Sequence, residues 1–249
     1  MDNLELVFYA AAGLAMSVFS GIAGGGGGFV MTPLAIFLGL SPAQAVSTSK
    51  ITGFSLTVGA LVGMRKSHGH VSKARIIPVM ILAIAVGLVV PFVIVAFDSA
   101  LYRNVLGIIL LLMIPIMLIK KVGVKPHHPK LWQKYAGGGL LALAMFLQGV
   151  FSGGLGTLVN VVLMGMMGMT ALEANLTKRW SQLLLNGTIV IGVLGTGLIV
   201  WKVALVGVVM TLIGGYVGGR VAVHKGDGFV VGILIALMFV SALGLIFGG

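Results

Sequence analysis

Long runs of apolar residues, separated by short polar or basic loops, fill almost the whole chain. A helix that crosses the hydrocarbon layer of a membrane needs roughly 20 apolar residues. The runs are continuous rather than alternating with polar positions, which favours membrane helices over the strands of a barrel. The pattern therefore predicts an all-α, polytopic membrane protein with about ten hydrophobic segments. These segments are 4–23, 27–40, 42–64, 74–97, 100–119, 135–152, 154–169, 171–195, 199–221 and 228–248.

Two of the runs, 27–40 and 154–169, are too short to cross the membrane comfortably. Each follows a glycine-rich break, Gly24–Gly28 in one case and Gly153–Gly156 in the other. Glycine destabilises a helix interior by about 1 kcal/mol relative to alanine, so five in succession do not sustain a helix. We expect interrupted, short or re-entrant helices after these breaks.

The composition agrees with lipid as the surrounding medium. Hydrophobic residues make up 59% of the chain and charged residues 8%, whereas about a quarter of a soluble domain is charged. There is no cysteine, which excludes disulfides and thiolate metal sites. The net charge of +11 comes from basic loops rather than from a basic face, so we expect no nucleic-acid partner. We also expect no cofactor and no metal.

Basic residues gather in three loops, at 65–75, 120–134 and 220–227. Because basic loops of membrane proteins stay in the cytoplasm, we predict that these three lie inside and that both termini lie outside. The loop 120–134 is then a basic cytoplasmic linker. It separates a first transmembrane repeat, 1–119, from a second repeat, 135–249.

The two halves of the chain resemble each other in sequence. Phe19–Gly24 aligns with Phe151–Gly156, and Gly39–Ala45 aligns with Gly168–Ala174. Five segments in each half is an odd number, so the halves would be inverted relative to each other in the membrane. Inverted repeats with interrupted helices are typical of transporters that bind their substrate near the bilayer midplane. Chance similarity between two glycine-rich apolar stretches is the alternative.

Two capping boxes mark equivalent helix starts, Ser41–Gln44 and Thr170–Glu173. Glu173 is therefore predicted to be a cap rather than a proton carrier. Nine residues beyond each cap stands a cation, Lys50 in one half and Arg179 in the other. This is about 13.5 Å along a helix, close to half of a hydrocarbon layer of about 30 Å. Both cations are thus expected near the midplane.

A bare cation at that depth costs at least about 2.5–3.5 kcal/mol, and no carboxylate of the sequence is expected there. We therefore predict that the missing counter-ion is an anionic substrate. Hydroxyls, amides and the backbone N–H groups of the glycine breaks would donate further hydrogen bonds to it. The candidate substrate-binding residues are Lys50, Arg179, Ser47, Ser49, Asn175, Gln182, Asn186, Gly25, Gly26, Gly27 and Gly154.

Each of these roles has a structural alternative. Polar residues in membrane helices often hydrogen-bond to neighbouring helices, and glycines often permit close helix packing. Ser49 and Lys178 lie one residue before the two cations, about 100° round the helix from them. Both are therefore weaker candidates than the two cations; Ser49 is kept in the candidate set and Lys178 is not.

These motifs resemble the sulfite exporter TauE/SafE family of the toluene sulfonate uptake permeases. The matching pieces are Phe19-Ser20-Gly21 before the glycine tract, Thr32-Pro33-Leu34, Gly39-Leu40-Ser41-Pro42 with Ala45, Ser47-Thr48-Ser49-Lys50, Phe151–Gly156 and Thr177-Lys178-Arg179. The resemblance covers nearly the whole chain. It implies a secondary transporter (a permease or exporter) of small sulfur-containing anions, such as sulfite or organosulfonates, in the bacterial inner membrane. Its partners would be the anion and the bilayer, and homodimer formation is left open.

Other classes of function fit the residues less well. An intramembrane enzyme would need a buried Ser–His pair, paired aspartates or metal ligands, whereas all five histidines fall in predicted loops. We therefore predict no enzymatic activity. A cation carrier would need carboxylates within the membrane. An anion channel, or a carrier of another small carboxylate or oxyanion, stays open as an alternative because sequence does not show whether a gate alternates.

Overall fold

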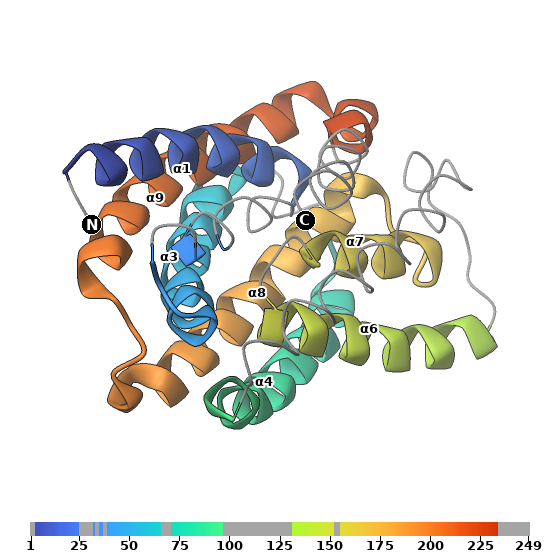
Figure 1. The fold of residues 1–249 in the computed structure, drawn as a ribbon. Coiled ribbons are helices and arrows are strands. Elements are labelled where there is room, and N and C mark those ends of the chain that lie inside the picture. Colours follow the sequence, from blue (N-terminus) through green and yellow to red (C-terminus); the bar gives the residue numbers. More distant parts are fainter. Residues whose placement is uncertain are drawn as a thin grey trace, which may run out of the picture.

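A computed structural model describes residues 3–24, 32, 35–36, 39–65, 71–96, 131–151 and 155–233. The regular elements of this part of the chain are all helices, with short turns next to some of them, and it contains no strand (Figure 1). Its elements are α1 (Asn3–Ala23), α3 (Pro42–Gly63), α4 (Lys73–Val95), α6 (Leu131–Phe151), α7 (Gly156–Gly165), α8 (Ala171–Val193), the short 3₁₀ helix η2 (Leu194–Thr196) and α9 (Trp201–Lys225). The all-α prediction is confirmed for these residues.

Five of these helices, α1, α3, α4, α6 and α9, are long and apolar enough to cross a membrane. The protein is therefore a multi-pass membrane protein. α7 has ten residues, and a helix of that length spans about 15 Å, so it is a short helix after the second glycine break, as predicted. The segment 100–119 and most of 27–40 and 228–248 lie outside the described residues.

Two helices extend beyond the apolar runs into the predicted basic loops. α6 begins at Leu131, so residues 131–134 of the predicted linker are helical. α9 ends at Lys225, so it includes most of the predicted loop 220–227. Trp132 and Tyr135 are strongly exposed near the start of α6, where amphipathic aromatic rings anchor a helix in the interfacial region.

Both predicted capping boxes are present. Ser41 Oγ accepts from the backbone N–H of Gln44 (3.3 Å), and Gln44 Oε1 accepts from that of Ser41 (3.0 Å). Thr170 Oγ1 and the Glu173 carboxylate make the same pair of bonds at 3.3 and 3.0 Å. The reciprocal bonds satisfy N–H groups that have no partner within the helix. Glu173 is therefore a cap, as predicted.

The helices pack around a central pair, α3 and α8 (Figure 1). α9 packs against α3 and α1, whereas α4 packs against α8 and α6. α7 lies against α6 and α8. Each central helix is therefore covered by a helix from the other half of the chain.

The close approach of α9 depends on four glycines. Gly214 and Gly218 face α1, and Gly215 and Gly219 face α3; a Cβ on any of them would lie less than 3.0 Å from an atom of the neighbouring helix. In lipid, where the hydrophobic effect between helices is weak, such small residues allow the backbone contact that holds helices together. These glycines are therefore required for packing.

Apolar and polar residues are distributed as expected for a protein surrounded by lipid. Large apolar side chains such as Phe8, Phe92 and Leu205 are exposed on the outer helices. In contrast, no residue of the polar helix α8 from Ala171 to Val190 is exposed. The polar interior is where a functional site is to be sought.

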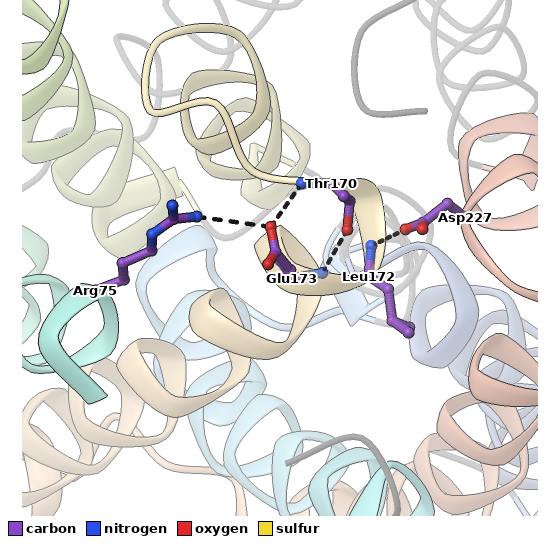
Figure 2. A network of polar contacts seen from close by, with 5 residues as sticks. All are labelled: Arg75, Thr170, Leu172, Glu173 and Asp227. Carbon is purple, nitrogen blue, oxygen red and sulfur yellow. Dashed lines mark hydrogen bonds and ion pairs between the residues drawn. The ribbon is translucent and has the colours of Figure 1, made fainter. Parts of the chain in front are cut away.

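The start of α8 is tied to two other elements at one end of the bundle (Figure 2). Arg75 of α4 lies 3.8 Å from the Glu173 carboxylate, and Asp227, after α9, accepts a hydrogen bond from the backbone N–H of Leu172 at 2.5 Å. Arg75 and Asp227, from the two regions predicted to be cytoplasmic, thus meet at the start of α8. Which side of the membrane they face stays a prediction.

Candidate functional site

Three cationic side chains lie in the interior of the bundle. Lys50, Lys178 and Arg179 are 3%, 1% and 0% exposed. Among the described residues each of them bonds to neutral oxygen atoms, and none forms an ion pair with a carboxylate. A buried charge without a counter-ion destabilises the fold, so the burial of these three cations requires explanation.

Arg179 reaches the C-terminal end of α1. Its Nη2 donates to the carbonyl of Ser20 and, at 3.1 Å, to that of Gly21. Its Nε donates to Asn175 Oδ1 at 3.2 Å, one turn earlier on α8. The last carbonyl groups of a helix lack partners within it and carry partial negative charge, so a cation is stabilising there.

Three further side chains bond to the carbonyls that follow. The bonds run from Asn175 Nδ2 to Ile22 O (2.7 Å), from Asn160 Nδ2 to Ala23 O (2.8 Å) and from Lys178 Nζ to Gly24 O. Every carbonyl from residue 20 to residue 24 thus accepts a bond from α7 or α8. We call this group of contacts the α1-end cluster.

Gly24 is required for this arrangement. Its φ of 75° is left-handed, which favours glycine. A Cβ there would lie less than 3.0 Å from the amides of Asn160 and Asn175. The end of the glycine-rich motif in the first half therefore leaves room for side chains of the second half.

Lys50 makes the corresponding contact at the end of α6. Its Nζ donates to the carbonyl of Gln148 at 2.9 Å, in the last turn of that helix. Lys50 and Arg179 thus each follow a capping box by nine residues. Each contacts the terminal turn of a helix from the other half.

Lys178 and Gln148 share the space beside Gly156, the first residue of α7. A Cβ on Gly156 would lie less than 3.0 Å from Lys178 Nζ and 3.3 Å from Gln148 Nε2. Gln148 therefore lies between the two lysines, since its carbonyl accepts from Lys50 and its side chain shares the Gly156 space with Lys178. The three cations consequently belong to one continuous region around the ends of α1 and α6.

Several buried polar atoms of this interior have no hydrogen-bond partner within the part of the chain that the structure describes. Arg179 Nη1 is the only guanidinium nitrogen of that side chain without one. An unpaired buried donor costs roughly 1–3 kcal/mol, which a bound acceptor would relieve. The other buried polar atoms without a partner are three hydroxyl oxygens and two amide oxygens: Thr32 Oγ1, Ser47 Oγ, Thr177 Oγ1, Asn160 Oδ1 and Gln182 Oε1.

The predicted site residues on α3 and α8 have different surroundings. Ser47 is fully buried and has no partner among the described residues. Half-buried Ser49 donates to the carbonyl of Val46 in its own helix at 2.7 Å. Asn186 is buried where α8 meets α3, and a Cβ on Gly53 would lie 2.9 Å from its Nδ2.

The predicted residues Gly25, Gly26, Gly27 and Gly154 lie outside the described part of the chain. Sequence reasoning missed Lys178, Asn160, Gln148 and Gly156. A signal for Asn160 and Gln148 was available, because each is a polar residue within an apolar run.

The described residues include no group of three or more histidines, aspartates or glutamates placed to hold a metal ion. In this part of the chain the buried chemistry is that of cations, amides and hydroxyls. A multi-pass helical bundle with such a polar centre, and with the short helix α7 beside it, is an architecture that membrane transporters use.

The comparisons with known proteins agree with this class. The chain belongs to the sulfite exporter TauE/SafE family, whose model matches residues 9–245. It is 26% identical to a probable membrane transporter protein, ORF9, of a Sinorhizobium species, across 97% of this chain and 94% of that protein. It is 23% identical to a probable membrane transporter protein of Haemophilus influenzae, across 99% of this chain and 96% of that protein. No solved structure matches it. The protein is therefore a membrane transporter.

Proposed function

We propose that this protein is a secondary transporter of small sulfur-containing anions, such as sulfite or organosulfonates, in the bacterial inner membrane. The anion binds between the two halves, near the bilayer midplane, at Arg179 and Lys50. The observation that carries this proposal is the buried, unpartnered Nη1 of Arg179 in a region that holds three cations. The description of the family names sulfite, whereas the two relatives are named only as transporters.

An anion suits this region for electrostatic reasons. Two unit charges 4 Å apart attract by about 4 kcal/mol at an effective dielectric constant of 20, and no described carboxylate supplies that attraction here. Arg179 Nη1 donates to one oxygen of the anion. The hydroxyl of Ser47, which has no partner among the described residues, provides a neutral donor on α3. On α8 the side chain of Gln182 would donate through its amide nitrogen, since its Oε1 can only accept.

We also propose that the chain forms ten segments in two inverted repeats of five. The packing supports this arrangement, because the series α1, α9, α3 in one part of the bundle corresponds to α6, α4, α8 in the other. The corresponding capping boxes and cations support it as well. Rocking of one repeat against the other around a fixed site would then give alternating access.

The test is flux into proteoliposomes of purified protein, with a panel of sulfite, methanesulfonate, acetate and chloride, each with and without a pH gradient. Saturable uptake of sulfite or methanesulfonate is expected, with acetate and chloride poorer. Very high unitary rates without saturation would instead favour an anion channel. Transport of acetate in preference to both sulfur anions would overturn the proposed substrate class.

A further inference from the structure

Lys178 has no role in the proposed site so far, yet it is almost completely buried next to Arg179. It is 1% exposed, and its Nζ donates to the carbonyl of Gly24. The absence of a side chain at Gly156 provides the space that its ammonium group occupies. The fold therefore makes specific room for a second cation beside the first.

Capping of α1 does not by itself account for this charge. The carbonyls of residues 20–23 already accept bonds from Arg179 and from two asparagine amides. A neutral amide at position 178 could donate to the carbonyl of residue 24 equally well. It would avoid the desolvation of a buried ammonium group and the repulsion between that group and a neighbouring guanidinium group. The positive charge of Lys178 thus needs a partner that the described residues do not provide.

We propose that Lys178 supplies a third positive charge to the anion site and makes that site selective for dianions over monoanions of the same shape. This inference rests on the anion transport proposed above. The other two positive charges lie in the same region. Lys50 is held there by its bond to the carbonyl of Gln148, and Arg179 by its bonds in the α1-end cluster. Three charges without a carboxylate are balanced better by a ligand of charge −2 than by one of charge −1.

The physical reason is that Coulomb attraction is proportional to the charge of the ligand. A neutral residue at position 178 therefore weakens the binding of a dianion more than that of a monoanion. A charge-assisted bond to a monoanion corresponds to roughly tenfold in affinity. Loss of the same positive charge weakens the binding of a dianion by about 100-fold, because the interaction energy is doubled. The ratio of the dianion affinity to the monoanion affinity therefore falls by about tenfold.

The experiment compares sulfate with methanesulfonate, which are both tetrahedral but carry charges of −2 and −1. Their dissociation constants are measured by calorimetry at pH 8 on the purified full chain and on Lys178→Gln, which retains a donor but loses the charge. The parent is expected to bind sulfate more tightly, and the variant to lose most of that preference. The control is Lys202→Gln, an exposed lysine at the start of α9, which should keep the parental ratio.

A merely structural role for Lys178 would lower both affinities equally or leave them unchanged, and either result overturns the inference. Because Lys178→Gln could also disturb folding, Gly156→Ala provides a second variant that retains the lysine but crowds its ammonium group. It should likewise lower the preference for sulfate, and an unchanged ratio there would count against the inference. If the parent protein binds none of sulfate, methanesulfonate and sulfite, the proposed function and the inference about Lys178 both fail. Parental binding with an unchanged ratio in the variants refutes the role of Lys178 alone.

Discussion

Replacement of Arg179 should affect both the anion and the fold, and the two effects have different sources. The anion loses the donor Nη1, which has no partner in the described structure. The fold loses the bonds from Nη2 to the end of α1 and the bond from Nε to Asn175. Arg179→Ala is therefore expected to weaken anion binding and to lower thermal stability.

The size of each effect follows from the contacts. A hydrogen bond to an ionised group contributes roughly 1.5–3 kcal/mol, which corresponds to about a ten- to hundredfold loss of affinity. The carbonyl of Ser20 keeps a bond from the N–H of Gly24 at 2.9 Å, so it does not become unpaired. Removal of a buried cation also relieves its own desolvation, which partly offsets the lost bonds. The loss of stability should therefore be the smaller effect.

Arg179→Lys separates charge from geometry. A lysine retains the positive charge but not the planar fork that engages two carbonyls and still presents a free nitrogen. The affinity of Arg179→Lys for the anion should lie between those of the parent and Arg179→Ala. Lys50→Ala is the matched variant in the other half, where a single bond to the carbonyl of Gln148 is lost.

The assay is calorimetric titration of purified, monodisperse protein with sulfite and methanesulfonate, together with thermal denaturation of each variant. Near-parental affinity in both Lys50→Ala and Arg179→Ala, with reduced thermal stability, would refute the reasoning. The two cations would then serve only to bind the carbonyls at the ends of α1 and α6.

Three further predictions follow from topology and packing. In right-side-out vesicles an impermeant thiol reagent should label Ser99→Cys but not Ser67→Cys, and the chain contains no native cysteine to interfere. The reverse labelling pattern would overturn the predicted orientation. Gly218→Val should prevent the close packing of α9 on α1 and lower the yield of folded protein, whereas Gly228→Ala, where a Cβ meets nothing within 4 Å, should not. Gly26→Val, in the glycine tract, should abolish anion binding with thermal stability close to that of the parent; a misfolded variant would instead favour a packing role.

Local patterns in the sequence were sufficient to predict most of the helices. The capping boxes at Ser41 and Thr170 placed the starts of α3 and α8, because a capping box involves only residues within one turn. Hydropathy and length predicted the membrane class and the short helix α7, because the thickness of the hydrocarbon layer sets the length that a crossing helix needs. The family resemblance, based on glycine-rich and cap motifs, is likewise confirmed.

The contacts of the buried cations were decided by the tertiary structure alone. Arg179 bonds to carbonyls 158 and 159 residues away, and no local pattern shows which helix ends meet in space. The argument from helical faces separated Lys178 from Arg179 by about 100°, yet both are buried because α8 is covered on its different sides by α3, α4 and α7. A helix at the centre of a bundle has no solvent face, so the angular position of a residue does not predict its burial. The sequence by itself thus determined the membrane class, most helix boundaries and the positions of the cations along their helices, whereas only packing decided that these cations meet the ends of α1 and α6.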